Sequence, residues 1–365
     1  MKALSAKSRS HLVSTILAGS WRKSDFPLLE FSESQLDEVT PLLYGSGAGG
    51  LGWWRVRNTV LRTSASAEVL HQAYRLQVLQ SAIHEHKICK VFGLLAQASI
   101  EAILVKGWAA AGLYPERGLR PYGDIDLLVR PEQSEAALKL LAGSEVQDCW
   151  IDLHKGISEL DDRPIRELFE RSQRLPLHEG TVTVLSSEDH LALLAVHLLK
   201  HGAWRPLWLC DIGAAIESLP ENFDWDVCLG RSRTRSGWII AAIRLAHTLL
   251  GARINSVPSE AAPLKPPDWL TQNVLREWEQ PFAGNQPPMS HPLPMSTVLR
   301  KPGMLPEALR QRWPNPILAT ISVNGQFNSM PRLPYQMGNC LLRAARLLAE
   351  IPRSISHRKE TLSPG

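Results

Sequence analysis

The segment RPYGDIDLLV, residues 120–129, constrains the fold most, because a run that is otherwise apolar carries two carboxylates. Successive side chains of a strand point to opposite faces, so Asp124 and Asp126 share one face while Ile125 points to the other. Neighbouring carboxylates repel each other unless a cation lies between them, and Mg²⁺ or Mn²⁺ suits carboxylate oxygens. The segment therefore predicts a strand with a metal site. A solvated strand end or turn is the alternative, because D-x-D is a common pattern.

Segments of helical and strand-like character alternate around this strand. Apolar residues three and four apart predict one or two amphipathic helices over 67–99. Short apolar runs predict four strands, and helical patterns separate the first three of them. The strands are expected within IEAILVKG, DIDLLVR, VQDCWIDLH and TVTVL, and the separating helices within WAAAGLYPE and PEQSEAALKLLAGS. This order predicts a small α/β or α+β unit.

The pattern changes along the rest of the chain. SSEDHLALLAVHLLKHG begins with helix-capping residues and continues with helical spacing, whereas residues 256–335 are dense in proline. An amphipathic basic helix is expected at GNCLLRAARLLAEI. The predicted regions are a helical or irregular lead at 1–66, the mixed unit at 67–186, a helical domain at 187–252, a proline-rich irregular region at 253–335, and an amphipathic helix with a loose tail at 336–365.

Composition limits the class of protein. The chain has 365 residues, of which 44% are hydrophobic and 21% charged, so neither wholesale disorder nor a coiled coil is predicted. The net charge of +4 tolerates a nucleotide or RNA without requiring one. The five cysteines are scattered without a CxxC pair, which favours a reducing cytoplasm. No apolar stretch approaches the roughly 20 residues of a membrane span, and the N-terminal apolar patch is too short for a signal sequence. We therefore expect a cytoplasmic protein.

The stretch YGSGAGGLGWW contains G-x-G-x-x-G at Gly45, Gly47 and Gly50. A dinucleotide-binding loop needs a strand before this pattern and a helix directly after it, and the sequence indicates neither. We therefore interpret the stretch as a flexible turn.

Two further features accompany the aspartates. The preceding strand ends in Lys106 and Gly107, a turn whose backbone N–H groups and ammonium group suit a phosphate. Asp152 lies between apolar residues of the next predicted strand, where it would supply a third metal ligand from a neighbouring strand. The alternative for Asp152 is an ion pair with Lys155 or Arg163.

Four histidines are further candidates. His154 follows the third aspartate by two residues and would orient a metal-bound water or contact a nucleotide, or it is a partly buried, hydrogen-bonded histidine. His190, His197 and His201 share one helical face, and Asp211 follows on the next helix. HLLKH has the i, i+4 spacing of a zinc-binding helix without the glutamate of metalloproteases. This face either binds a second metal, as in a metal phosphohydrolase, or packs against the mixed unit, and packing is favoured.

The lysine-glycine turn, the D-x-D strand and the third acidic strand, in this order, resemble the nucleotidyltransferase superfamily that includes DNA polymerase beta. More narrowly, ILVKGWAAAGLYPERGLRPYGDIDLLVRPEQSEAALKLL resembles a bacterial family of stand-alone, uncharacterised nucleotidyltransferases. IDLH and SSEDHLALLAVHLLKHGAWRPLWLCDIGAAI resemble later segments of that family, so the resemblance covers about residues 70–220. It implies an α+β fold in which a mixed β-sheet, flanked by helices, is followed by a helical domain.

The resemblance also implies an activity. An NMP group would pass from an NTP, ATP among them, to a hydroxyl group of RNA, a protein or a small molecule, and pyrophosphate would leave. Asp124, Asp126 and Asp152 would bind Mg²⁺ or Mn²⁺, and Asp152 would help to deprotonate the acceptor.

Four other residues would lie at the nucleotide. By the resemblance, Lys106 and Arg120 would offset charge on the triphosphate and on the leaving pyrophosphate, because phosphoryl transfer relies on positioning and electrostatic stabilisation. From their positions in the sequence, Gly107 in the phosphate-binding turn and His154 would also contact the nucleotide. Arg120 would alternatively only cap its loop.

The lysine-glycine turn stands where the superfamily usually has Gly-Ser or Gly-Gly, and its interval to the aspartates is longer than usual. These departures support an alternative function, a non-catalytic module that binds a nucleotide or a partner.

Overall fold

The computed structural model describes residues 8–178, 180–258, 265–279, 303 and 312–345. The helices are α1 (Arg9–Leu17), α2 (Glu33–Gly45), α3 (Gly49–Val56), α4 (Ala65–Gln97), α5 (Trp108–Ala111), α6 (Ser134–Leu141), α7 (Ile165–Arg171), α8 (Ser187–Lys200), α9 (Pro206–Glu217), α10 (Trp225–Leu229), α11 (Arg233–Leu250), α12 (Asp268–Trp278) and α15 (Pro316–Ser322). The 3₁₀ turns are η1 (Val60–Thr63), η2 (Pro131–Gln133), η3 (Ser144–Val146) and η4 (Ser158–Leu160). The strands are β1 (Ala102–Leu104), β2 (Ile125–Val129), β3 (Ile151–His154), β4 (Gln173–Leu177) and β5 (Gly180–Val184).

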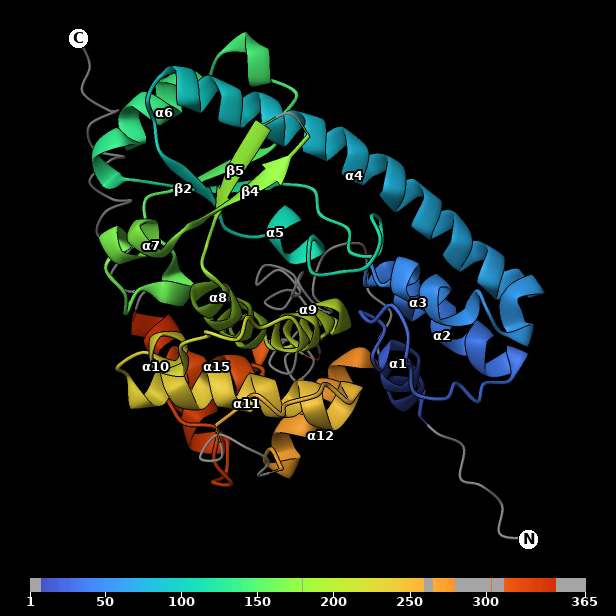
Figure 1. The fold of residues 1–365 in the computed structure, drawn as a ribbon. Coiled ribbons are helices and arrows are strands. Elements are labelled where there is room, and N and C mark those ends of the chain that lie inside the picture. Colours follow the sequence, from blue (N-terminus) through green and yellow to red (C-terminus); the bar gives the residue numbers. More distant parts are fainter. Residues whose placement is uncertain (1–7, 179, 259–264, 280–302, 304–311, 346–365) are drawn as a thin grey trace, which may run out of the picture.

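The five strands form one mixed sheet in the order β3-β2-β1-β5-β4. The β1–β2 and β4–β5 pairs are antiparallel, whereas β1–β5 and β2–β3 are parallel. Helices α4 and α6 lie on one side of the sheet, and the layer of α8, α9 and α11 lies on the other (Figure 1). The predicted α+β class, a mixed sheet flanked by helices and followed by a helical portion, is confirmed.

The two faces of β2 have different roles. Ile125, Leu127 and Val129 are buried in a hydrophobic cluster with residues of α4 and α6. Leu128 points the other way, into the core that contains α8. Because side chains alternate along a strand, Asp126 lies on the Leu128 face, toward the helical layer.

Helix α4 joins the sheet to the N-terminal helices. Its 33 residues extend over about 50 Å. Leu70, near its start, belongs to the core shared with α2 and α3, while Ile88 and Leu95 cover the sheet. Figure 1 shows α4 passing over the sheet and on to α2 and α3. The helical periodicity over 67–99 therefore corresponds to one continuous helix.

The glycine-rich stretch is helical over much of its length, and its interpretation as a flexible turn is wrong from Gly49 onward, where α3 begins. An added Cβ at Gly49 would lie 2.8 Å from the Cβ of Ala73 on α4. An added Cβ at Gly50 would lie 2.6 Å from the carbonyl oxygen of Gly118. These glycines are required because backbone segments pack closely there, and not because the chain is flexible.

Strand β4 was not expected from the sequence. Its pattern QRLPL has four exposed residues and a proline, and β4 is the last strand in the sheet order. An edge strand needs only one hydrogen-bonding partner and tolerates proline, so it shows no buried apolar run.

The C-terminal residues that the structure describes also join the main core. Trp278 of α12 and Ile317 of α15 are fully buried in the same cluster as Leu12 of α1. Residues 333–345 are helical, so the predicted C-terminal helix begins before residue 338. Residues 259–264, 280–302 and 304–311 of the proline-rich region, and the tail from residue 346, lie outside the described residues. Within the described ranges, no helix has both the length and the apolarity needed to cross a membrane. The five predicted regions stay a prediction.

Candidate functional site

Asp126, Asp152 and His154 come together where β2 and β3 pair. The two strands are parallel, and their register sets Asp126 directly beside Asp152. His154 Nε2 lies 2.9 Å from Asp126 Oδ1 and 3.4 Å from Asp152 Oδ2. One ligand atom from each residue falls within 4.8 Å of the others. This first cluster, Asp126–Asp152–His154, has the composition and spacing of a divalent-metal site.

Lys106 links the first cluster to the helical layer. It lies two residues after the end of β1, and its Nζ lies 3.9 Å from Asp126 Oδ1 and 3.7 Å from Glu159 Oε1. The next residue, Gly107, has φ of +57°, and an added Cβ would lie 3.4 Å from the Cβ of Tyr122. Glycine adopts this conformation readily, so the chain can turn here. The predicted lysine-glycine turn places the ammonium group of Lys106 near the carboxylates of Asp126 and Glu159.

The charges of the first cluster stabilise one another. Burial alone would raise the pKa of Asp126, but the hydrogen bond with His154 and the charge of Lys106 outweigh burial and lower it. The hydrogen bond with Asp126 raises the pKa of His154 against the effect of its partial burial. Asp152 is exposed, so the cluster has one buried and one accessible carboxylate.

A second cluster, Glu159–His197–His201, lies next to the first. His197 Nδ1 is 3.0 Å from Glu159 Oε1, and the rings of His197 and His201 have centroids 4.4 Å apart. Burial would raise the pKa of Glu159, but the His197 hydrogen bond and the Lys106 charge hold it well below its usual range. Glu159 was not a candidate from the sequence, because it is a single acidic residue in a 3₁₀ turn with no motif around it.

Asp124 lies one residue before β2 and is exposed. The strand ladder begins at Ile125, whose N–H donates to the carbonyl of Trp150. Burial lowers the pKa of His84, and the charge of Asp124 opposes this shift. At Arg120, burial would lower the pKa, but Asp211 outweighs burial and raises it, and Asp124 adds to the effect of Asp211. Of the two aspartates predicted to share a metal site, Asp126 is therefore buried within β2, whereas Asp124 is exposed just before the strand begins.

Arg120 is buried in an ion pair. Its guanidinium group donates to Asp211 on α9, with Nη2 2.8 Å from Oδ2, and Tyr114 donates its hydroxyl to the same carboxylate at 2.8 Å. Arg120 Nη1 also donates to the carbonyl of Pro121. These contacts fix the segment before β2 to the helical layer.

His190 is buried beside this ion pair, and among the described residues its Nε2 has no hydrogen-bond partner. His190 therefore has the packing role that the sequence favours, whereas His197 and His201 lie beside Glu159. Burial lowers the pKa of His190 to about 4, although the charge of Asp211 opposes the shift.

This burial predicts an acid-sensitive contribution to stability. An unfolded histidine has a pKa of about 6.5, so between about pH 6.5 and pH 4 the unfolded state binds more protons and stability falls as the pH falls. We expect His190 to account for about 2 kcal/mol of lost unfolding free energy between pH 7 and pH 5. Urea unfolding of the native protein and of His190→Leu at both pH values measures it. An equal pH-dependent loss in the two proteins would contradict the assignment.

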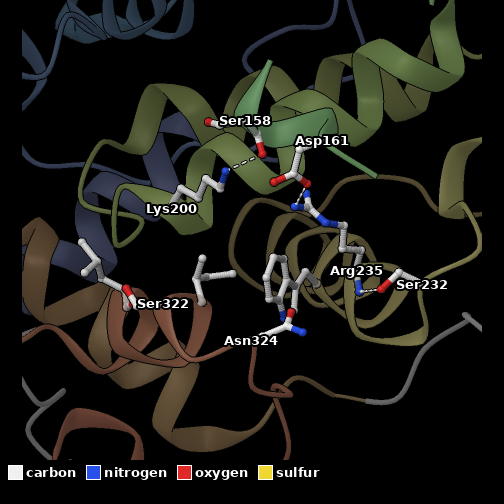
Figure 2. Close-up of a pocket in the computed structure, with 10 residues that line it drawn as sticks. Ser158, Asp161, Lys200, Ser232, Arg235, Ser322 and Asn324 are labelled. Atoms are coloured by element: carbon white, nitrogen blue, oxygen red, sulfur yellow. Dashed lines mark hydrogen bonds and ion pairs between the residues drawn. The ribbon is translucent and has the colours of Figure 1, made fainter. Parts of the chain in front are cut away.

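A polar pocket of about 800 Å³ lies beside the second cluster. Ser158 and Lys200, the chain neighbours of Glu159 and His201, line it together with Arg235 from α11 and Asn324 after α15 (Figure 2). Lys200 Nζ donates to the carbonyl of Ser158 at 2.6 Å. Asp161 also lines the pocket and pairs with Arg235, so the lining carries charges of both signs.

A comparison with known protein families shows which family the chain belongs to. A model of a family described as uncharacterised nucleotidyltransferase matches residues 55–148 and 143–251, which together are more than half of the chain. The chain belongs to this family. No curated protein and no solved structure matches it.

The match to this nucleotidyltransferase family includes both clusters and the buried Arg120–Asp211 pair. It begins inside α3 and ends just after α11, so α1, α2, α12 and α15 lie outside it. The predicted family membership is confirmed.

Proposed function

We propose that the protein is a metal-dependent nucleotidyltransferase that transfers an NMP group from an NTP, ATP among them, to a hydroxyl group of an acceptor. The observation that carries the proposal is the first cluster with Lys106 beside it, in a chain of a nucleotidyltransferase family. The acceptor class stays open among RNA, a protein and a small molecule.

The residues present fit a divalent metal ion. Two carboxylates from neighbouring strands and one imidazole offer oxygen and nitrogen donors within one ion's reach, and oxygen donors suit Mg²⁺ or Mn²⁺. Asp126 and Asp152 would hold the ion, and Asp124 would add a third carboxylate from the exposed strand entrance. When bound, such an ion neutralises phosphate charge and orients the reacting oxygens.

The remaining chemistry falls to the side chains around the ion. An acceptor oxygen forms a bond to the α-phosphorus, and the bond from that phosphorus to the bridging oxygen breaks, so that pyrophosphate leaves. Asp152 is the accessible carboxylate of the cluster and would take the acceptor proton. Lys106 would offset charge on the phosphates, because such reactions depend on positioning and electrostatic stabilisation. Gly107 would let phosphate approach the turn, and His154 would hold Asp126 in place.

A transfer experiment tests the proposal. The purified protein is incubated with each α-³²P-labelled NTP, Mg²⁺ or Mn²⁺, and a cell extract that contains RNA, proteins and metabolites. We expect label on one class of acceptor with the native protein and none with the Asp124→Ala/Asp126→Ala variant. Metal-dependent NTP binding without transfer by the native protein would instead support the non-catalytic module. Absence of both binding and transfer would remove the proposal.

A further inference from the structure

The second cluster combines two imidazoles with one buried carboxylate. Glu159 is on η4, His197 is in the last turn of α8, and His201 is the residue that caps this helix. The spacing of four residues sets both rings on one helical face. One ligand atom from each of the three residues lies within 4.8 Å of the others.

The backbone of η4 is held in position independently of the cluster. Arg235 Nη1 donates to the carbonyl of Glu159 at 2.8 Å, and Lys200 Nζ donates to the carbonyl of Ser158 at 2.6 Å. Leu160, the last residue of η4, is buried in the main core. The carboxylate of Glu159 is therefore presented to α8 by a fixed turn, which lowers the ordering cost of binding a ligand.

The histidine rings are also held by packing. Trp208 of α9 contacts both rings, with centroids 4.8 Å from His197 and 5.2 Å from His201. The indole limits the rotation of both rings and excludes water from one side, which strengthens electrostatic interactions there. His201 itself is exposed, so an ion has a path from solvent.

We propose that Glu159, His197 and His201 form a second metal site, which binds a divalent transition-metal ion of the Zn²⁺ type. Two imidazole nitrogens and one carboxylate oxygen are a common ligand set of zinc sites that keep a further position open. The first cluster has the opposite balance, with two carboxylates and one imidazole, which suits harder ions. The chain would therefore bind two kinds of cation at adjacent places.

Lys106 separates the two sites. Its ammonium group lies between Asp126 and Glu159, at 3.9 and 3.7 Å from the nearest carboxylate oxygens. A cation in either cluster is repelled by this charge, so a single ion shared by both carboxylates is disfavoured. The polar pocket begins one residue away from Glu159 and from His201, on the side of Ser158 and Lys200 (Figure 2).

Cobalt binding tests this site without any nucleotide. The full-length protein is treated with a chelator, and Co²⁺ is added while the visible ligand-field absorption is recorded. We expect one equivalent of Co²⁺ to give absorption bands that Zn²⁺ removes and that millimolar Mg²⁺ does not. His201→Ala should weaken Co²⁺ binding at least tenfold, because the variant loses a direct ligand. Since His201 is exposed, this variant is expected to fold.

Three variants distinguish this site from its alternatives. Glu159→Gln keeps the size of the side chain and removes the charged ligand, so Co²⁺ binding should weaken at least tenfold as well. Asp152→Asn should keep the bands, and so should His86→Ala, which removes an exposed histidine of α4. Bands that persist in His201→Ala, or that disappear in Asp152→Asn, would overturn the proposal. The readout does not depend on transfer, so failure of the proposed enzyme activity leaves this inference standing.

Discussion

Asp152→Asn is expected to reduce nucleotidyl transfer by at least about 100-fold while the protein stays as stable as the native form. Loss of a residue that only supports a metal ligand already costs about 10- to 100-fold, and we assign Asp152 a direct ligand role. Asparagine preserves the shape of the side chain but has no negative charge to bind a divalent ion or to take a proton from the acceptor.

The position of Asp152 makes this variant informative. Its side chain is 63% exposed, and its nearest cationic partner is His154 at 3.4 Å. Exposed substitutions away from special features usually change stability by no more than about 0.5 kcal/mol. Lost transfer therefore reports on the reaction and not on the fold. Asp126→Asn would be less clear, because Asp126 is buried against Lys106 and His154.

Transfer of label from an α-³²P-labelled NTP, measured together with thermal unfolding, tests this expectation. Asp148→Asn is the matched control, because Asp148 is an exposed aspartate in the loop before β3 whose side chain contacts Lys87. The control should leave transfer and unfolding unchanged. Transfer by Asp152→Asn within tenfold of the native rate would exclude a direct role for this carboxylate.

Much of the first cluster could be predicted from local patterns in the sequence. Apolar runs located β1, β2 and β5 because those strands contain buried side chains, and they located β3 because its Ile151 and Leu153 pack, partly buried, against the same cluster. Alternation along a strand then indicated that Asp152 and His154 share a face, and the β2–β3 register adds Asp126 to them. The prediction was less exact for Asp124, because the local pattern does not determine at which residue the ladder begins.

The partners of charged residues could not be predicted in the same way. Glu159 meets His197 only because η4 packs on α8, and this contact depends on the tertiary structure. Arg120 likewise pairs with a residue 91 positions later in the chain. Neither contact follows from periodicity, since each needs the helical layer to be docked on the sheet.

The buried pair of Arg120 and Asp211 leads to the largest expected loss of stability. Asp211 is fully buried, and the Arg120 side chain is 10% exposed. Asp211→Ala would leave the guanidinium group buried without its counter-charge and would remove the acceptor of the Tyr114 hydroxyl. Breaking a buried pair on one side typically costs about 3–5 kcal/mol, and we expect the unfolding free energy to fall by that amount.

Chemical denaturation of Asp211→Ala measures this loss. Glu170→Ala, which breaks the exposed Arg166–Glu170 pair on α7, is the control and should cause little change. The double variant Arg120→Met/Asp211→Leu should be more stable than Asp211→Ala, because it removes both buried charges instead of isolating one. A double variant no more stable than the single one would show that the loss does not come from the unpaired charge.

The same variants decide between the two roles considered for Arg120. If Arg120 only fixes the segment before β2, the double variant that keeps the fold should also keep metal-dependent NTP binding, because the paired guanidinium group makes no contribution to the triphosphate. If Arg120 contacts the phosphates, NTP binding should weaken by about tenfold or more, as expected for a lost charge-assisted hydrogen bond worth about 1.5–3 kcal/mol. Its bonds to Asp211 and Pro121 in the structure favour the first result.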